Sequence, residues 1–408
     1  MTERVIIVGA GQAGGWAACT LRDEGYSGSI VLVGGEVHPP YERPPLSKEV
    51  LLGESDPHTL TIVDEAKLNE LNVVCRFGVE VVSINRAEHT ITLSGGEKLP
   101  YDKLILCTGG RARQLTIDGI EHERVHVLRT LDDALRLKAA LTEEVGRVLV
   151  IGGGWIGLEV AASSRRLGCD VTIVEYANRL CQRSVSPDMS DALLVLHREQ
   201  GNEVLLGISV ARLEQVESGL RVALSNGQTL ICSHVIMAAG LVANDELARE
   251  AGLLCDNGIY VDEKCCTSDP NIYAAGDVAI TEMFAVGTKA RLESWQNAQD
   301  QGIAVAHSVL GHEISYKPTP FLWSHQFDQF IQIVGHVNSG VVTALRHTPN
   351  RGTLRFYLDG EQKIVGVIGM NAGREFRSAR QLVGGHASIS PLDLADPGLP
   401  LKDLVAKH

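Results

Sequence analysis

The chain has 408 residues, of which 44% are hydrophobic and 21% charged, and its 37 basic and 50 acidic residues give a formal net charge of −13. This length suits two or three domains better than one compact core. The acidic balance argues against bulk binding of nucleic acid. No uncharged apolar run reaches the roughly 18 residues of a membrane-spanning helix, so we expect no membrane partner.

The start of the chain and its cysteines predict where the protein works. The first four residues lead directly into a predicted strand, without the basic segment and apolar core of a signal peptide. The nine cysteines include no C-x-x-C pair. We therefore expect a cytoplasmic protein with reduced, mostly structural thiols. The adjacent Cys265 and Cys266 are among them, since neighbours are poorly placed for an unstrained disulfide.

The first motif in the chain joins two apolar strands through a glycine turn. The predicted elements are a strand at 5–8, a helix over 15–24 and a strand at 30–33. Gly9 permits a tight turn, Gly11 lets the backbone approach a pyrophosphate, and Gly14 lets the helix pack closely on the strand. The free N–H groups at the helix start favour phosphate, and Glu36 can accept hydrogen bonds from ribose hydroxyls.

The same pattern recurs in the middle of the chain. The predicted elements are a strand at 147–151, a helix over 158–167 and a strand at 171–174, with Gly152, Gly154 and Gly157 in the turn. Two copies predict two dinucleotides in two related domains. Glu175 ends the second strand, where a carboxylate accepts from the 2′-OH of NAD and repels the 2′-phosphate of NADP. Arg179 is nearby, but Tyr176 and Ala177 follow directly, so we predict NADH over NADPH.

Three further apolar runs end in small or polar residues suited to a cofactor. One run precedes Thr108-Gly109, and another ends at Gly240. The third closes with Gly276-Asp277, which places a backbone N–H beside a carboxylate and suits a polyol phosphate.

The last part of the chain changes in character after Tyr316. The predicted elements are antiparallel strands at 331–334, 341–345, 354–358 and 364–368, followed by a helix over 374–382. Arg374, Arg377 and Arg380 lie along one face of that helix. Either this stripe receives an acidic partner protein, or it is a solvated helix face.

Two charged residues stand out between the motifs. Pro44 and Pro45 stiffen the segment that holds Lys48, and Glu159 lies one turn into the second nucleotide helix, on a small and apolar face. The alternatives are a solvated lysine on a rigid loop and an ordinary helix glutamate.

These motifs, in this order and over nearly the whole chain, resemble the oxygenase-coupled NADH–ferredoxin reductases, a group that includes the aromatic-ring dioxygenase reductases and putidaredoxin reductase. Rubredoxin reductase and apoptosis-inducing factor are more distantly similar. The resemblance implies an α/β fold with two Rossmann-like, glutathione-reductase-like dinucleotide-binding domains and a C-terminal α+β domain with an antiparallel sheet. The implied domains are 1–111 with 243–316 for FAD, 112–242 for NAD, and 317–408 at the C-terminus.

The resemblance also implies the site residues. Those assigned to FAD are Gly9, Gly11, Ala13, Gly14, Glu36, Arg43, Lys48, Val81, Thr108, Gly109, Arg129, Gly276, Asp277, Glu293, Trp295 and Trp323. Those assigned to NADH are Gly152, Gly154, Ile156, Gly157, Glu159, Glu175 and Gly240. Lys48 and Glu159 form the implied catalytic pair, one near the flavin N5 and the other near the nicotinamide. For Arg129 and Trp323, a surface arginine and a core tryptophan remain alternatives.

The implied function is transfer of electrons from NADH through FAD to a [2Fe–2S] ferredoxin, which supplies an oxygenase of aromatic hydrocarbon catabolism. The ferredoxin is expected near Trp323 and the arginine stripe. No cysteine cluster suits an iron–sulfur centre, so no metal is expected in this chain. A rubredoxin acceptor, or a flavoprotein that acts through NADH-dependent partner binding, is the alternative. Disulfide reductases and NADH oxidases are disfavoured, because Pro44, Pro45 and Leu46 stand where their flavin-adjacent cysteine would fall.

Overall fold

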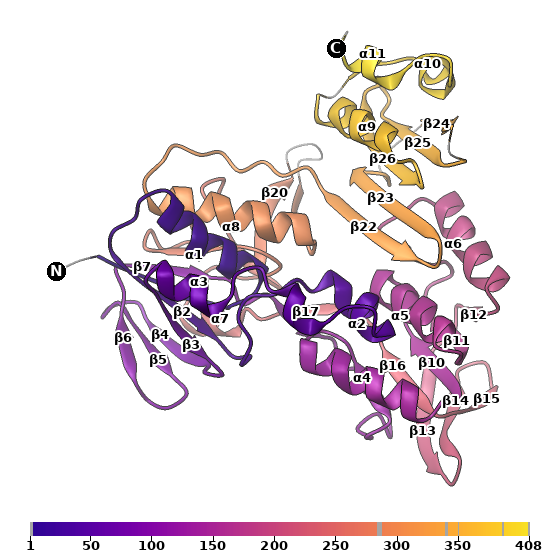
Figure 1. Ribbon diagram of the computed structural model, residues 1–408, viewed down its shortest axis with the longest axis horizontal. Coiled ribbons are helices and arrows are strands. Elements are labelled where there is room, and N and C mark those ends of the chain that lie inside the picture. Colours follow the sequence, from indigo (N-terminus) through magenta and orange to yellow (C-terminus); the bar gives the residue numbers. More distant parts are fainter. Residues whose placement is uncertain (1–2, 284–287, 339–341, 350, 386, 407–408) are drawn as a thin grey trace. The chain divides into compact units, whose positions relative to one another are not determined.

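The computed structural model in Figure 1 describes residues 3–283, 288–338, 342–349, 351–385 and 387–406. The chain forms two compact units. Unit 1 comprises Met1–Arg43, Pro57–Arg111 and Leu241–Thr319, and unit 2 comprises Pro44–Asp56, Ala112–Gly240 and Pro320–His408. Unit 2 thus contains both the predicted NAD segment and the C-terminal segment, and the division into three domains stays a prediction.

Unit 1 is built around a parallel sheet with the order β19-β7-β1-β2-β3. The bounds are β1 Arg4–Val8, β2 Ser29–Gly34, β3 Val73–Phe77, β7 Lys103–Leu106 and β19 Ile272–Ala274. Val5 pairs with Ile30 on one side and Lys103 on the other. The central strand is almost fully buried, as expected for a continuous apolar run in a parallel sheet covered on both faces.

Helices and smaller sheets complete unit 1. The helices are α1 Gln12–Asp23, α3 Glu65–Glu70, α7 Glu246–Glu250, α8 Trp295–Val309 and the 3₁₀ turn η2 Pro57–Leu60. The other strands are β4 Val81–Asn85, β5 Thr90–Leu93, β6 Lys98–Pro100, β8 Gly110–Ala112 (whose last residue is counted in unit 2), β17 Leu241–Ala243, β18 Ile259–Tyr260, β20 Ala279–Met283 and β21 Thr288–Arg291. α1 and α8 pack closely, because Gly302 has no Cβ to overlap the backbone of Ala13.

Unit 2 contains a second parallel sheet, with the order β12-β11-β10-β16-β9. The strands are β9 Val125–Val127, β10 Arg147–Ile151, β11 Asp170–Glu175, β12 Glu203–Leu206 and β16 His234–Met237. The accompanying elements are η1 Pro44–Ser47, α2 Glu49–Leu52, α4 Leu131–Glu143, α5 Trp155–Arg166, α6 Pro187–Glu199, β13 Val210–Val216, β14 Gly219–Leu224 and β15 Thr229–Cys232. A capping box between Thr130 and Asp133 starts α4.

The C-terminal part of unit 2 is an antiparallel sheet with the order β22-β23-β26-β25-β24. The elements are β22 Phe321–Gln326, β23 Gln329–Gly335, β24 Val342–His347, β25 Thr353–Leu358, β26 Ile364–Met370, α9 Arg374–Gly384, α10 Pro391–Ala395 and α11 Leu401–Val405. The predicted antiparallel sheet and its helix are confirmed, although Val341, where one strand was expected to begin, lies outside the described residues.

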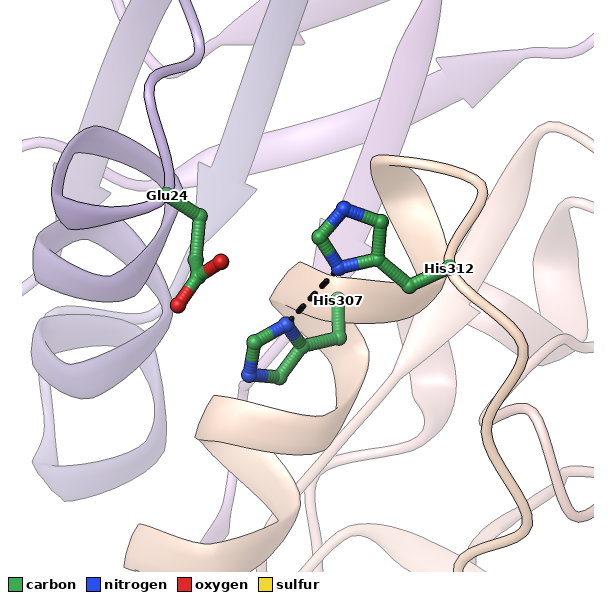
Figure 2. Close-up of side chains that lie close together, drawn as sticks. All are labelled: Glu24, His307 and His312. Atoms are coloured by element: carbon green, nitrogen blue, oxygen red, sulfur yellow. Dashed lines mark hydrogen bonds between the residues drawn. The ribbon is translucent and has the colours of Figure 1, made fainter.

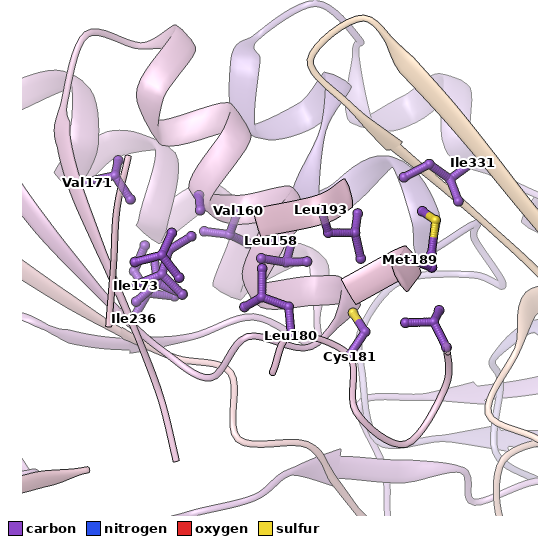
Figure 3. Packing of buried hydrophobic residues seen from close by; sticks show 14 of the residues in the cluster. Leu158, Val160, Val171, Ile173, Leu180, Cys181, Met189, Leu193, Ile236 and Ile331 are labelled. Atoms are coloured by element: carbon purple, nitrogen blue, oxygen red, sulfur yellow. The ribbon is translucent and has the colours of Figure 1, made fainter. Parts of the chain in front are cut away.

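One hydrophobic core joins the nucleotide sheet and the C-terminal sheet of unit 2. Figure 3 shows Leu158 of α5, Ile173 of β11 and Leu193 of α6, together with Ile331 of β23. Segments before and after residue 320 therefore bury apolar side chains in the same cluster. Burial of apolar surface is the main favourable contribution to folding.

Both nucleotide helices begin earlier than the sequence predicts, at Gln12 instead of Gly15 and at Trp155 instead of Leu158. The last glycine of each turn lies inside the helix, where a Cβ on Gly14 or Gly157 would overlap the carbonyl oxygen of Gly9 or Gly152. The predicted fold class is confirmed. None of the described helices combines the length and the hydropathy needed to cross a bilayer.

Candidate functional site

The first glycine turn of unit 1 has the form of a dinucleotide cradle. Gly9 has a φ of +111°, and a Cβ there would overlap the carbonyl oxygen of Cys107. At Gly11 an added Cβ would meet open space. The turn therefore leaves room beside the start of α1, where unpaired N–H groups face an approaching phosphate.

Buried polar atoms next to this cradle lack partners among the described residues. The side-chain amide of Gln12, in the first position of α1, has both its oxygen and its nitrogen buried and unpaired. The indole nitrogen of Trp295, at the start of α8, is in the same state. Because unpaired buried polar groups are unfavourable, these residues fit a polar ligand such as FAD in the cradle.

Glu36 lies beyond β2, as predicted, and is held by two neighbours. Its Oε1 accepts from Nη2 of Arg43 at 2.6 Å, and its Oε2 accepts from the Tyr41 hydroxyl at 2.6 Å. Burial works to lower the pKa of Arg43, but Tyr41 and Glu36 together raise it. Each carboxylate oxygen keeps a second lone pair, so Glu36 can still accept from a ribose hydroxyl.

The strand ends of unit 1 gather other predicted FAD residues. A Cβ on Gly276 would lie 3.0 Å from that of Ala13, so the Gly276-Asp277 turn lies against the start of α1. The Thr108 hydroxyl donates to the carbonyl of Asn244 at 2.7 Å, and the Asn244 amide donates back to the carbonyl of Thr108 at 2.9 Å. Asn244 was not expected from the sequence, since a loop asparagine far along the chain carries no local signal.

The remaining predicted FAD residues of unit 1 occupy defined positions. Gly109 follows β7 with a φ of +61°, and Val81 begins β4. Glu293 forms an ion pair with Arg291 at 2.8 Å, just before α8. Their contact with FAD stays a prediction.

The second glycine turn, in unit 2, repeats the geometry of the first. Gly152 has a φ of +114°, and a Cβ there would overlap the carbonyl oxygen of Ala238. Gly154 again faces open space. Ile156, in the first turn of α5, is 47% exposed, and its contact with NADH stays a prediction.

Glu175 is tied to this turn at the end of β11. Its two carboxylate oxygens accept from the N–H of Gly153 at 2.5 Å and of Ala177 at 2.7 Å. Nearby Arg179 donates to the carbonyls of Val185 and Gln182, so its guanidinium is engaged by the protein. Gly240 follows β16 with a φ of +98°. The arrangement leaves a carboxylate beside the turn and suits NAD.

The structure brings Lys48 and Glu159 together inside unit 2. They are 6% and 4% exposed, and Nζ of Lys48 lies 2.8 Å from Oε2 of Glu159. Nζ also lies 5.0 Å from the ring centroid of Trp323, within cation–π range. Lys48 is therefore not a solvated lysine, and Glu159, for which an ordinary helix glutamate was the alternative, is a buried carboxylate paired with it.

Glu159 accepts two further hydrogen bonds from serines that the sequence analysis missed. The Ser47 hydroxyl donates to Oε2 at 2.5 Å, and the Ser324 hydroxyl of β22 donates to Oε1 at 2.7 Å. A signal for the second was present, because Ser324 and Gln326 are polar residues at alternate positions of a strand, and both are fully buried. Alternation of this kind places polar side chains together on one face.

A chain of hydrogen bonds continues from Ser324 to α6. Because an ionised Glu159 only accepts, Ser324 donates to it and accepts from Nε2 of Gln326 at 3.0 Å. The Gln326 carbonyl then accepts from Nε2 of His197 at 3.0 Å, and Nδ1 of His197 accepts from Asn202 at 2.9 Å. All donors point toward Glu159. Burial lowers the pKa of His197 to about 4, which agrees with a neutral ring.

Three residues predicted to contact FAD belong to unit 2 and not to unit 1: Lys48, Arg129 and Trp323. Glu159, predicted to approach the nicotinamide, also belongs to unit 2. Arg129 precedes the cap of α4, and its backbone N–H donates to Asp133 at 3.1 Å. Their roles toward the flavin stay predictions.

The arginine stripe lies on α9 as the sequence predicts. Arg374, Arg377 and Arg380 are exposed, whereas Phe376 and Ala379 on the other face are buried. The guanidinium of Arg380 lies 4.5 Å from the centroid of Phe321 at the start of β22. The stripe is therefore a basic surface above the sheet that carries Trp323.

The cysteines show no arrangement for redox chemistry. All nine are free thiols, and burial is the main factor that raises the pKa of each, to about 12 for Cys107 and about 11 for Cys19. Since the thiolate is the reactive form, these cysteines are poor nucleophiles at neutral pH.

Comparisons with known proteins agree with this geometry. Residues 3–302 match the family described as pyridine nucleotide-disulphide oxidoreductase, and residues 321–405 match the one described as reductase C-terminal. The chain is 37% identical over 387 residues to the ferredoxin–NAD(+) reductase component of 3-phenylpropionate/cinnamic acid dioxygenase from Photorhabdus laumondii, covering 95% of this chain and 98% of the relative.

Two more similarities extend over nearly the full length. The ferredoxin–NAD(+) reductase component of the p-cumate 2,3-dioxygenase system from Pseudomonas putida is 38% identical over 98% of both chains. The reductase in the covalent putidaredoxin reductase–putidaredoxin complex is 33% identical, with a TM-score of 0.94 over 99% of this chain and 98% of that one. The chain thus belongs to the pyridine nucleotide-disulphide oxidoreductases, and within them to the ferredoxin–NAD(+) reductases that carry a reductase C-terminal domain.

Proposed function

We propose that this chain is an FAD-dependent NADH–ferredoxin reductase that supplies electrons to an oxygenase system acting on aromatic compounds. The observation that carries the proposal is the pair of glycine cradles, one in each unit, in a chain that lacks a reactive thiol. The ferredoxin–NAD(+) reductase components of dioxygenase systems, similar over nearly their full length, support the same conclusion. The prediction of a cytoplasmic location remains a prediction.

The overall reaction balances without any acid–base pair in the protein. One NADH and two oxidised [2Fe–2S] ferredoxins give NAD⁺, two reduced ferredoxins and one proton. FAD, when bound, accepts the two electrons of a hydride and releases them singly. The chain's own residues bind and orient the two dinucleotides: Gly9, Gly11 and Gly14 for FAD, and Gly152, Gly154 and Glu175 for NADH.

The Lys48–Glu159 pair is the proposed charged group of the reaction centre. Lys48 would present a positive charge to reduced FAD, which is anionic, while Glu159 and the Trp323 ring keep the ammonium in place. Three hydrogen bonds, from Lys48, Ser47 and Ser324, hold the glutamate in a single orientation. Orientation by buried neighbours is the usual way in which a protein makes a charged group precise in position.

For the partner, we propose that an acidic [2Fe–2S] ferredoxin docks near Trp323 and the arginine stripe of α9. A basic surface on a protein with a net charge of −13 gives an acidic partner one favourable place to approach. Arg374, Arg377 and Arg380 would set orientation and encounter rate.

The proposed function is tested with the purified yellow protein. NADH is mixed anaerobically with the protein, and the loss of flavin absorbance is followed. Cytochrome c reduction is then measured with NADH or NADPH, with and without candidate [2Fe–2S] ferredoxins. We expect rapid bleaching by NADH and turnover that depends on a ferredoxin. Flavin that stays oxidised with NADH, or reduction by NADPH in preference, would contradict the proposal. A rubredoxin assayed in parallel distinguishes the rubredoxin alternative.

A further inference from the structure

Three potential metal ligands meet where α1 and α8 end. Glu24 caps the C-terminus of α1, His307 lies in the last turn of α8, and His312 follows just beyond that helix. One ligand atom from each lies within 4.8 Å of the others, and Nδ1 of His307 is 3.1 Å from Nδ1 of His312 (Figure 2). All three residues belong to unit 1.

The spacing of the two imidazoles is that of ligands on one ion. With Zn–N bonds of about 2.0–2.1 Å, a tetrahedral site separates its nitrogens by roughly 3.3 Å, and a six-coordinate site by roughly 3.0 Å. The observed 3.1 Å lies between these values. In Figure 2 the Glu24 side chain extends from its helix toward the two rings, so one carboxylate oxygen completes a three-ligand set.

The electrostatic setting also favours a cation. The C-terminus of each helix carries a partial negative charge, and here two helices end at the same place. No basic side chain among the described residues forms an ion pair with Glu24. Neutral imidazole and carboxylate together suit Zn²⁺, Ni²⁺ or Cu²⁺ better than Mg²⁺ or Ca²⁺.

We propose that Glu24, His307 and His312 form a binding site for one divalent transition-metal ion, such as Zn²⁺, with its remaining positions open to water. The site lies outside the proposed electron transfer and was not expected from the sequence. Its ion would cross-link the C-terminal ends of α1 and α8. The proposed FAD contacts Ala13 and Trp295 lie at the N-terminal ends of the same two helices. The metal therefore stabilises the flavin-binding unit.

The competing explanation is a simple hydrogen bond between two histidines. The structure contains a useful comparison, since Nε2 of His126 and Nδ1 of His234 are also 3.1 Å apart. That pair is not joined by a third ligand atom in the part of the chain that the structure describes. If spacing alone bound metal, both pairs would do so.

The test uses untagged, full-length, FAD-loaded protein that has been treated with a chelator and dialysed. Zn²⁺ binding is measured by equilibrium dialysis and by calorimetry. We expect one Zn²⁺ per chain, with affinity weakened about tenfold or more in His307→Ala and in His312→Ala, and by less in Glu24→Gln. His126→Ala and His347→Ala, the latter at an exposed histidine, should leave the affinity unchanged. Equal binding by His307→Ala, His312→Ala and His347→Ala would overturn the proposal.

Two further readouts keep the test independent of folding and of ferredoxin turnover. Cu²⁺ bound to the wild type should give an electron paramagnetic resonance spectrum with two coupled nitrogens, and with one in His312→Ala. Zn²⁺, unlike Mg²⁺, should raise the temperature at which FAD is released. Should His307→Ala lose FAD on purification, His307→Gln replaces it. A Cu²⁺ spectrum that is the same in wild type and His312→Ala would count against the site, whatever the protein's reductase activity.

Discussion

At the scale of single residues, the buried polar side chains around Glu159 in unit 2 are hydrogen-bond partners of one another. Glu159 is a buried carboxylate whose oxygens accept from Lys48, Ser47 and Ser324. Removing one donor leaves a buried acceptor without a partner. The free energy lost in this way is larger than the net stabilisation that one hydrogen bond contributes. Stability is therefore sensitive to each member of this cluster.

Ser324→Ala is expected to lower the free energy of unfolding by about 1–3 kcal/mol, because it removes the hydrogen-bond partner of Oε1 of Glu159 and of Nε2 of Gln326. Urea unfolding of the FAD-loaded protein measures the change. His325→Ala, at the exposed neighbouring position of β22, should change it by less than about 0.5 kcal/mol. Equal effects of the two substitutions would show that the Ser324 hydrogen bond is unimportant.

The Lys48–Glu159 ion pair invites a double-mutant cycle. Glu159→Gln leaves a buried ammonium without its counter-charge, so we expect a loss of about 3 kcal/mol or more in the free energy of unfolding. Lys48→Met combined with Glu159→Gln removes both charges and should be more stable than Glu159→Gln alone. Additive losses in the double variant would contradict a direct interaction.

At the scale of elements, the position of Glu175 at the end of β11, beside the turn between β10 and α5, gives it two partners: a predicted ribose and the backbone of the turn. Its predicted partner is the ribose of NAD, and its carboxylate accepts from the N–H groups of Gly153 and Ala177. We therefore expect a substitution at Glu175 to change the coenzyme preference and also to remove the two backbone hydrogen bonds that its carboxylate accepts.

The double variant Glu175→Ser with Tyr176→Arg is expected to shift kcat/KM toward NADPH by about tenfold or more, since it removes the repelling carboxylate and adds a cation at a position that is 82% exposed. KM for NADH should rise at the same time. Tyr176→Arg alone is the control and should keep the preference for NADH. An unchanged ratio in the double variant would argue against the assigned role of Glu175.

The end of α6 gives unit 2 a predicted dependence on pH. Burial lowers the pKa of His197 from 6.5 to about 4, and the hydrogen bond to Gln326 opposes this only partly. Above pH 6.5 the ring is neutral in both states and has no effect. Between pH 6.5 and 4 the unfolded chain takes up a proton that the folded chain does not, so stability falls as the pH falls.

The loss from His197 amounts to about 2 kcal/mol at pH 5. His197→Gln cannot titrate, so its unfolding temperature should depend less on pH between 7 and 5 than that of the wild type. Differential scanning calorimetry at several pH values measures this. His347→Gln, at an exposed histidine, should behave as the wild type does. A wild-type slope in His197→Gln would place the origin of acid lability elsewhere.

At the scale of the whole molecule, an overall charge of −13 contrasts with a basic stripe on α9. Attraction between exposed charges is screened over about 8–10 Å at physiological ionic strength. Docking by the stripe therefore predicts that turnover with an acidic ferredoxin falls as salt rises, whereas NADH-to-dye turnover does not.

Arg377→Glu should reduce the ferredoxin-dependent rate about tenfold at low salt, mainly through KM for ferredoxin, and should leave NADH–ferricyanide turnover intact. Arg221→Glu makes the same change of charge on β14 and serves as the matched control. Parallel loss of both activities in Arg377→Glu, or equal loss of ferredoxin turnover in the control, would count against docking at α9.

Most of the fold was predictable because its signals are local. Continuous apolar runs predicted the parallel strands at 5–8 and 147–151, since burial on both faces leaves no polar positions. Glycines at fixed spacing predicted both turns, because a Cβ at Gly9 or Gly152 would overlap a neighbouring carbonyl oxygen. Residue patterns within a segment of about thirty residues were sufficient to predict these elements.

The tertiary structure alone decided which distant residues meet. Ser47, Glu159 and Ser324 come from three segments. The alternation of Ser324 and Gln326 marks a polar strand face, but no local pattern shows that this face and Ser47 meet Glu159. Glu24 meets His307 only because α1 and α8 pack side by side. A buried charge needs partners, but the sequence does not show which segment supplies them, because that depends on how the chain folds. The amino-acid sequence thus determined the two dinucleotide cradles, and tertiary packing determined the charged cluster and the candidate metal site.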